Sequence, residues 1–438
     1  MIALIQRVSS ARVAVDGETV GACGLGYLVL LGVAETDEES DIARLGDKLL
    51  KLRIFADENG KMNRSILDVG GEALVVSQFT LMANYSHGNR PEFFAAANSG
   101  RGFVSFYDEI FNTDKIKRRF LIKGGPGTGK STLMRRVADS AHCNGAQVCL
   151  YRCSSDPSSL DGVLINGEIA VLDSTAPHAV EPELVGARDS IVDLGAFWDV
   201  SRLSAERERI SALTDEKKRA YSLGYRFLAS SMQCDIAARE LLRPYVDLAR
   251  IKRTARRLTR AIPRDSSYER HVGLLSAIGM NGRHALDTYR RLAKRVILIE
   301  AHYGLENLLL SEICAFAFEN QNKISVSYRP LCPELPDAVY FEREGVAFLI
   351  APPRTKGAIS LARALDLSHF SKNERNLLKS RVRNAQSTSD SLVDSAILEL
   401  SLAGKAHFEL EKIYSSAMDF SRLEGVVVSL CQEFRSLF

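Results

Sequence analysis

A glycine-rich segment in the middle of the chain has the spacing of a phosphate-binding loop. Residues 124–131 follow the pattern G-x-x-x-x-G-K-S. Such a loop turns successive backbone N–H groups toward phosphate, and the N-terminus of the following helix adds positive potential. We expect Lys130 to reach the β- and γ-phosphates of ATP and Ser131 to ligate Mg²⁺. The predicted nucleotide-binding residues are Gly124, Gly125, Pro126, Gly127, Thr128, Gly129, Lys130, Ser131 and Thr132.

A later acidic residue is the candidate for the other side of this magnesium shell. Asp173 directly follows the apolar segment 168–172, and we expect it to lie opposite Ser131. The alternative is an aspartate that only caps a turn. Ser174-Thr175 stand where many ATPases place a catalytic glutamate, so hydrolysis stays open. The flanking loops offer substitutes, for which solvated or structural roles are expected: Asp156, Asp161 and His178.

Polar side chains also follow an apolar segment near the amino terminus. Residues 73–76 are predicted to form a buried strand that ends in Ser77-Gln78-Phe79-Thr80. A hydroxyl nucleophile needs a base, and His87 is the only histidine of this part of the chain. From the residues alone, a strand end that satisfies its own backbone groups is the simpler interpretation.

Two different element patterns surround these candidates. Up to about residue 110, strands at 2–8 and 27–32 and a helix after Thr36 indicate a small α+β domain. From residue 113, short apolar strands alternate with helices, and 203–265 reads as long helices. We therefore expect a multidomain α+β and α/β protein, with domains at 1–110, 113–292 and 293–438.

The amino-terminal part resembles the D-aminoacyl-tRNA deacylases in six blocks of the right order and spacing. The blocks are Ile5-Gln-Arg-Val8, Gly26-Tyr-Leu-Val-Leu-Leu-Gly-Val33, Leu52-Arg-Ile-Phe55, Gly60-Lys-Met-Asn63, Val76-Ser-Gln-Phe-Thr-Leu81 and Arg90-Pro-Glu-Phe93.

This resemblance implies an esterase that needs no metal or cofactor. Its substrate would be D-aminoacyl-tRNA, or glycyl-tRNA mischarged on tRNA-Ala. The catalytic residues would be Ser77, Gln78, Phe79 and Thr80, with Arg7 binding substrate. Backbone N–H groups at a strand exit stabilise a tetrahedral oxyanion, so Thr80 is free to orient substrate while the nucleophile stays open. The resemblance also implies a homodimer of the bacterial cytoplasm.

The chain departs from this family after Phe106-Tyr107. Family members continue for about another third of their domain, to a Gly-Pro-x-Thr motif that screens chirality across the dimer interface. The only such tetrapeptide here is Gly125-Pro-Gly-Thr128, which the phosphate loop already explains. The amino-terminal domain is therefore expected to be incomplete.

The remainder resembles a family of uncharacterised bacterial P-loop ATPases that carry two lobes in tandem. The residues that carry this likeness are 153–162 and 172–178. Residues 295–304 repeat 118–127 at an offset of 177, which sets Asn307 and Leu308 under Lys130 and Ser131 and puts Ile350 under Asp173. The second lobe is therefore expected to be a degenerate P-loop-like repeat, unless two βα units coincide by chance.

Charge and composition separate the same two parts. Residues 1–112 hold 10 Lys/Arg against 15 Asp/Glu, whereas the remainder holds 47 against 39. Eight cysteines without CxxC spacing, the lack of a leader pattern and the lack of a long apolar run predict a reduced cytoplasmic protein without a membrane partner. The segment 250–264 is either a stripe that binds a polyanion or the solvated face of a helix. It has seven cations in fifteen residues, which are Arg250, Lys252, Arg253, Arg256, Arg257, Arg260 and Arg264.

Three hypotheses follow. The first is an esterase for mischarged tRNA fused to an ATP-binding module. The second is an ATP-dependent switch whose amino-terminal domain only binds RNA or dimerises. The third is a join of two genes, suggested by the abrupt loss of family pattern between residues 107 and 118.

Overall fold

The computed structural model describes residues 2–15, 18–33, 39–77 and 90–436. The chain forms two compact units, 1–89 and 90–438. The first unit therefore ends about twenty residues before the expected boundary near 110. The reason is that β8 (Glu92–Phe94) pairs in parallel with β12 (Val148–Arg152) of the second unit.

The first unit has a three-stranded sheet in the order β1-β4-β7. β4 (Gly26–Gly32) lies between β1 (Ile2–Val8), which is antiparallel to it, and β7 (Glu72–Ser77), which is parallel. Tyr27 and Phe55 stack at 5.3 Å in a small core. The predicted strand at 73–76 is confirmed as part of β7, but its predicted burial was wrong, because β7 is an edge of the described sheet and Val75 is 55% exposed. The remaining elements are β2 (Ala11–Val15), β3 (Glu18–Cys23), α1 (Glu39–Lys51), β5 (Phe55–Ala56) and β6 (Met62–Arg64).

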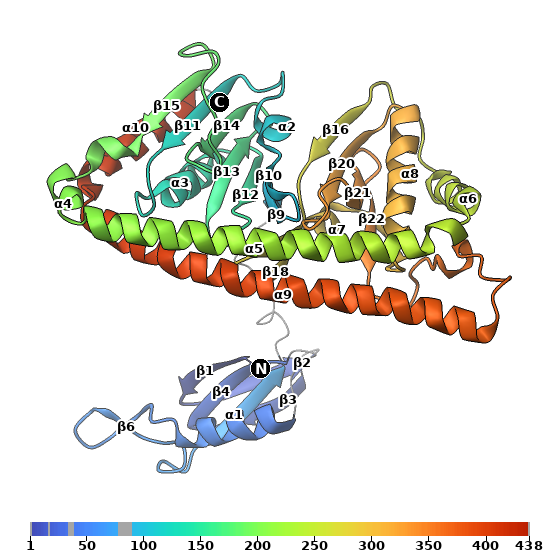
Figure 1. Ribbon diagram of the computed structural model, residues 1–438. Helices are drawn as coiled ribbons and strands as arrows, with labels where there is room; N and C mark the ends of the chain where they lie inside the picture. The colour runs from blue at the N-terminus through green and yellow to red at the C-terminus, as the bar shows by residue number, and fades with distance from the viewer. Residues whose placement is uncertain (1, 16–17, 34–38, 78–89, 437–438) are drawn as a thin grey trace. The chain divides into compact units, whose positions relative to one another are not determined.

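The second unit has two lobes, each built on one sheet (Figure 1). The first sheet has the order β15-β11-β14-β13-β12-β8 and the second the order β16-β20-β21-β22-β19. The further strands of the first sheet are β11 (Arg118–Lys123), β13 (Leu160–Ile165), β14 (Ile169–Asp173) and β15 (Asp189–Asp193). Those of the second are β16 (Glu269–Val272), β19 (Arg295–Glu300), β20 (Lys323–Tyr328), β21 (Pro336–Phe341) and β22 (Val346–Ala351).

The two sheets share one register. Arg118 of β11 pairs with Ile169 of β14, and Arg295 of β19 pairs with Val346 of β22, so both strands keep the offset of 177. Each lobe also has a small hairpin and a short helix before the strand that leads into its loop, β11 in the first lobe and β19 in the second. These are β9 (Ala96–Ser99), β10 (Gly102–Ser105) and α2 (Tyr107–Phe111) in the first lobe, and β17 (Ser276–Gly279), β18 (Gly282–Ala285) and α7 (Thr288–Leu292) in the second.

Two long antiparallel helices join the lobes (Figure 1). α5 (Arg207–Leu242) packs along α9 (Lys372–Ser416), and the buried Ser231 and Ser389 hydroxyls meet at 2.8 Å. Each helix carries the chain across to the other lobe. α6 (Leu248–Thr259) packs on α8 (Leu305–Glu319) of the second lobe, and α10 (Phe420–Ser436) packs on α3 (Lys130–Cys143) of the first. Residues 113–292 and 293–438 therefore do not separate as the expected domains, because each lobe is completed by the other half of the chain.

The predicted long helices at 203–265 correspond to α4 (Val200–Ala205), α5 and α6. On α6 the apolar Ile251 and Ala255 are buried and the basic side chains are exposed, which is the geometry of a solvated helix face. Arg250, Arg253 and Arg257 line a shallow pocket of about 600 Å³ together with Arg363. Among the helices of the described residues, none is both long and apolar enough to cross a bilayer.

The boundary at residue 89 predicts which fragments fold. A fragment that starts at Arg90 is expected to fold on its own, with a helical circular dichroism spectrum and a cooperative melting transition. A chain that starts at residue 113 is expected to stay unfolded, because it lacks five large core side chains, each worth about 1.5–3 kcal/mol. These are Phe93, Phe94, Phe106, Tyr107 and Phe111. Cooperative melting of the shorter fragment would refute this boundary.

Candidate functional site

The glycine-rich loop connects a central parallel strand to a helix, as its sequence predicted. β11 ends at Lys123, and α3 begins at Lys130. Gly127 and Gly129 have φ values of +68° and +84°, which glycine adopts without strain. Gly129 is the N-cap of α3 and no side chain caps the helix there. The first backbone N–H groups of α3 are therefore not taken by a side-chain cap, as an anion site at a helix N-terminus requires.

Lys130 folds back over this loop. Its Nζ donates hydrogen bonds to the carbonyl oxygens of Gly124 and Gly125, each at 2.8 Å, and lies 3.6 Å from Asp173 Oδ2. Thr128 Oγ1 also donates to Gly125 O at 2.9 Å. The ammonium group is thus held close to the loop backbone and to Asp173.

The two predicted magnesium ligands lie at the same edge of the sheet. Asp173 ends β14 opposite Ile122 of β11, and Ser131 is in the first turn of α3. Asp173 Oδ1 accepts the N–H of Thr175 at 2.9 Å, so it also caps a turn. Ser131 Oγ accepts the N–H of Leu160 at 3.0 Å. A hydroxyl and a carboxylate beside a lysine fit the oxygen ligands that Mg²⁺ prefers.

The far end of the chain covers the loop. A β-carbon built on Gly127 would lie 2.5 Å from the carbonyl oxygen of Glu411, near the end of α9. Trp198 and Tyr414 lie over Gly125, with their rings 5.4 Å apart. These residues leave no local signal in the sequence of the loop, because Trp198 lies about 70 residues downstream and Glu411 and Tyr414 about 285.

This close approach predicts a specific cost at Gly127. Gly127→Ala is expected to lower the free energy of unfolding by about 2 kcal/mol, because the positive φ alone costs about 1 kcal/mol and the new methyl group also meets α9. Gly167→Ala is the matched control, since Gly167 has φ +71° and its β-carbon would meet nothing within 4 Å. Urea unfolding of both variants measures the difference. Equal losses would mean that α9 does not restrain the loop.

The second lobe closes the equivalent loop with its own carboxylate. Gly304, with φ +87°, is the N-cap of α8 just as Gly129 is of α3, but the loop is two residues shorter. The residues that replace Lys130 and Ser131 are therefore Leu305 and Glu306, not the expected Asn307 and Leu308. Glu306 Oε2 accepts the N–H groups of His302 and Gly304 at 2.8 and 3.1 Å. An anion cannot use amides that a buried carboxylate already holds.

Two of the three residues expected to be solvated or structural are buried, which excludes a solvated role, and Asp161 lies on β13 and not in a loop. Asp161 is 3% exposed and His178 is 9% exposed, and His178 Nε2 lies 3.5 Å from Asp161 Oδ2. Burial raises the pKa of Asp161, and His178 opposes this shift. Asp156 has a structural role, because it accepts hydrogen bonds from Ser158 and Ser159.

The predicted catalytic residues of the first unit lie at the edge of what the structure describes. Ser77 ends β7, whereas Gln78, Phe79, Thr80 and His87 lie outside the described residues. Arg7 is exposed on β1, and its Nη1 donates to Ile54 O at 2.7 Å.

Comparison with known proteins places the amino-terminal part. The sequence profile of the family described as D-Tyr-tRNA(Tyr) deacylase matches residues 4–125. The D-aminoacyl-tRNA deacylase of Variovorax paradoxus is 58% identical over 109 residues, which are 24% of this chain and 75% of that protein. Its counterpart in Thermus aquaticus is 47% identical over 125 residues, which are 28% of this chain and 81% of that protein. The chain belongs to the D-aminoacyl-tRNA deacylase family.

One further relative is matched over most of its own length, and one solved structure is similar in sequence. The D-aminoacyl-tRNA deacylase of a Sulfurihydrogenibium species is 42% identical over 139 residues, which are 29% of this chain and 95% of that protein. A solved structure titled c-Myc DNA Unwinding Element Binding Protein is 45% identical and covers 18% of this chain and 54% of its own, with a TM-score of 0.18.

The deacylase family match and the structural boundary do not coincide. The match reaches residue 125, beyond Tyr107, where the resemblance was expected to fade. In this structure residues 92–123 nevertheless contain β8 to β11 and α2, which belong to the second unit. Two strands of the segment that completes the family match, β8 and β11, therefore lie in the sheet that carries the glycine-rich loop of residues 124–131, called the phosphate-type loop below.

Proposed function

We propose that this chain hydrolyses the ester bond of D-aminoacyl-tRNA and that its second unit binds MgATP. Membership of the deacylase family carries the first part of the proposal. Glycyl-tRNA mischarged on tRNA-Ala is a further substrate under the same proposal. A homodimer formed through the first unit, as the resemblance implies, belongs to it as well.

The ester reaction needs hydrogen-bond donors, which the segment at the end of β7 can supply. Water adds to the ester carbonyl carbon, and the resulting oxyanion is stabilised by backbone N–H groups of the segment Ser77-Gln78-Phe79-Thr80. Collapse of this intermediate releases the D-amino acid and leaves the terminal adenosine of the tRNA with a free hydroxyl. Thr80 orients the substrate, Arg7 binds it, and no metal or cofactor takes part.

The nucleotide part of the proposal is carried by the geometry around Lys130. An ammonium group close to the loop backbone, an N-terminus of α3 without a side-chain cap and the neighbouring Ser131 and Asp173 form one set at the end of β11 and β14. Gly124 to Thr132 would hold the phosphates, and Ser131 with Asp173 would hold the Mg²⁺ that neutralises their charge.

A second candidate function is an ATP-dependent switch. It is favoured by the packing of α9 and α10 against the loop, because a nucleotide bound there would act directly on α9 and, through it, on its partner α5. It is also favoured by the loss of residues 90–125 from the first unit, which leaves that unit with 89 residues to hold its sheet. Under this candidate the first unit is inactive as an esterase and only binds RNA or dimerises.

Release of D-tyrosine from D-tyrosyl-tRNA by the full chain, without ATP, separates the two candidates. We expect turnover that is selective for the D-form over L-tyrosyl-tRNA, and a loss of about 100-fold in Thr80→Ala, the size of effect typical of a misplaced substrate. A folded protein that binds nucleotide but releases no D-tyrosine would exclude the esterase and leave the switch.

A further inference from the structure

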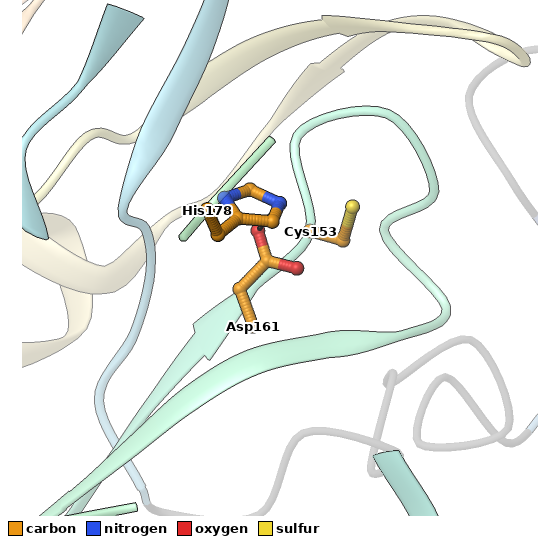
Figure 2. A group of neighbouring side chains, drawn as sticks. All are labelled: Cys153, Asp161 and His178. Carbon is orange, nitrogen blue, oxygen red and sulfur yellow. Dashed lines mark ion pairs between the residues drawn. The ribbon is translucent and has the colours of Figure 1, made fainter. Parts of the chain in front are cut away.

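Three side chains of metal-binding type converge in the first lobe of the second unit (Figure 2). Cys153 follows β12, Asp161 is the second residue of β13, and His178 lies in the loop after β14. One ligand atom from each, Sγ, a carboxylate oxygen and a ring nitrogen, lies within 4.8 Å of the other two. Neighbouring strands of one sheet therefore bring together residues from three separate segments.

The polar groups of this cluster are poorly satisfied by the protein. Asp161 Oδ2 and His178 Nδ1 are buried and have no hydrogen-bond partner, and the 3.5 Å contact between His178 Nε2 and Asp161 Oδ2 is too poorly placed to count as one. A buried carboxylate or imidazole without a partner costs about 1–3 kcal/mol. A cation held between these atoms would remove that cost.

The surroundings hold the imidazole in place. The Tyr107 ring stacks on His178 at 5.1 Å and Phe103 meets it edge-on at 4.9 Å, while Tyr107 Oη donates to the backbone carbonyl of Asp161 at 3.3 Å. Such packing fixes the direction of a ligand before a metal arrives, which is the role of outer partners in metal sites.

We propose that Cys153, Asp161 and His178 form a binding site for a divalent transition metal, with Zn²⁺ as the best match. Sulfur, nitrogen and carboxylate oxygen are all zinc ligands, and the sulfur separates this site from the oxygen ligands Ser131 and Asp173. Two nitrogen or oxygen ligands of one tetrahedral zinc lie about 3.4 Å apart, close to the 3.5 Å seen between His178 and Asp161. Three protein ligands leave a fourth position for water or a substrate oxygen.

The site adjoins the phosphate-type loop. Leu160, the residue before Asp161, donates its N–H to Ser131 Oγ, so a metal that fixes Asp161 also fixes a partner of Ser131. The metal site does not depend on the proposed nucleotide binding, and it is tested without nucleotide.

Cobalt binding to the chelator-treated full-length protein tests the proposal. We expect about one equivalent of Co²⁺ to bind with the near-ultraviolet charge-transfer band of a cobalt–thiolate bond, and Zn²⁺ to displace it. Cys153→Ser is expected to abolish the band. Cys149→Ser is the matched control, because Cys149 is a partly buried thiol on β12, just before Cys153 and outside the cluster, and the band should persist.

The wild-type measurement decides the matter even where a variant fails to fold. A wild-type protein that binds no cobalt, or binds it without a thiolate band, would overturn the proposal, and so would a band that survives in folded Cys153→Ser. His178→Gln provides a second check, with an expected loss of at least 10-fold in cobalt affinity. Unchanged affinity in that variant would remove His178 from the site and contradict the assignment.

Discussion

Replacing Lys130 with alanine is expected to weaken MgATP binding by about 100-fold. The Lys130 ammonium already makes two hydrogen bonds to the loop, and phosphate oxygens offer it stronger, charge-assisted partners. Hydrogen bonds to charged groups contribute about 1.5–3 kcal/mol each. A net loss of about 2.7 kcal/mol corresponds to the 100-fold change. Isothermal titration of the full chain with MgATP measures it directly.

Lys123→Ala is the matched control for this variant. Lys123 ends β11, the strand that leads into the loop, but its Nζ donates to Val180 O and to Glu181 Oε1, each at 3.2 Å, and not to the loop. We expect its MgATP affinity to stay within about twofold of the wild type. Equal affinity in Lys130→Ala and the wild type would exclude the proposed phosphate site, while a parallel loss in both variants would point to a general electrostatic effect.

The second large effect is expected in the core of the first lobe. Arg119→Met should lower the free energy of unfolding by about 3–5 kcal/mol, the usual range for breaking a buried ion pair. Arg119 is 1% exposed and Asp189 is 0% exposed, and the guanidinium donates two hydrogen bonds of 2.9 and 2.8 Å to the carboxylate. Without Arg119, a buried carboxylate keeps only its other partners. Urea unfolding of residues 90–438 or of the full chain provides the measurement.

A pH series identifies the cause of this loss. Burial raises the pKa of Asp189, but hydrogen bonds from Arg119, Arg188 and two backbone N–H groups outweigh it and leave the pKa well below its ordinary 3.8. The stability that this carboxylate contributes is therefore present above about pH 4 and is lost as the pH falls further. We therefore expect the free energy of unfolding to fall less steeply below about pH 4 in Arg119→Met than in the wild type.

An exposed ion pair serves as the comparison. Lys117 and Glu168 lie 2.8 Å apart with side chains 69% and 45% exposed, so Lys117→Met is expected to cost less than about 1 kcal/mol. A loss in Arg119→Met as small as this would mean that the buried pair does not stabilise the lobe.

The phosphate-type loop could be predicted from sequence because it is a local structure. Its glycines, Lys130 and Ser131 are consecutive, and the flanking apolar runs fix a strand and a helix within about ten residues of them. The position of Asp173 near Ser131 was predictable for a related reason, since neighbouring parallel strands end at the same edge of a sheet. The repeat at an offset of 177 was visible in the strands, where side-chain alternation is retained, but not in the second loop, where two residues are missing.

The structure changed the interpretation where partners are distant in sequence. The first unit ends at Asn89 because the next strand, β8, belongs to the second unit, where its Glu92 forms a buried ion pair with Arg152. The two residues are 60 positions apart, so no local sequence pattern predicts the pair. Glu306 closes the second loop because the shorter turn moves its carboxylate onto the backbone amides.

By itself, the sequence determined the family of the amino-terminal part, the phosphate-type loop and the strands and helices around it, because each depends on neighbouring residues. Only the tertiary structure decided that α9 covers the loop and that Cys153, Asp161 and His178 meet. These contacts arise from helix and strand packing between segments up to nearly 300 residues apart. Whether each of these side chains is buried depends on all the elements that pack against it.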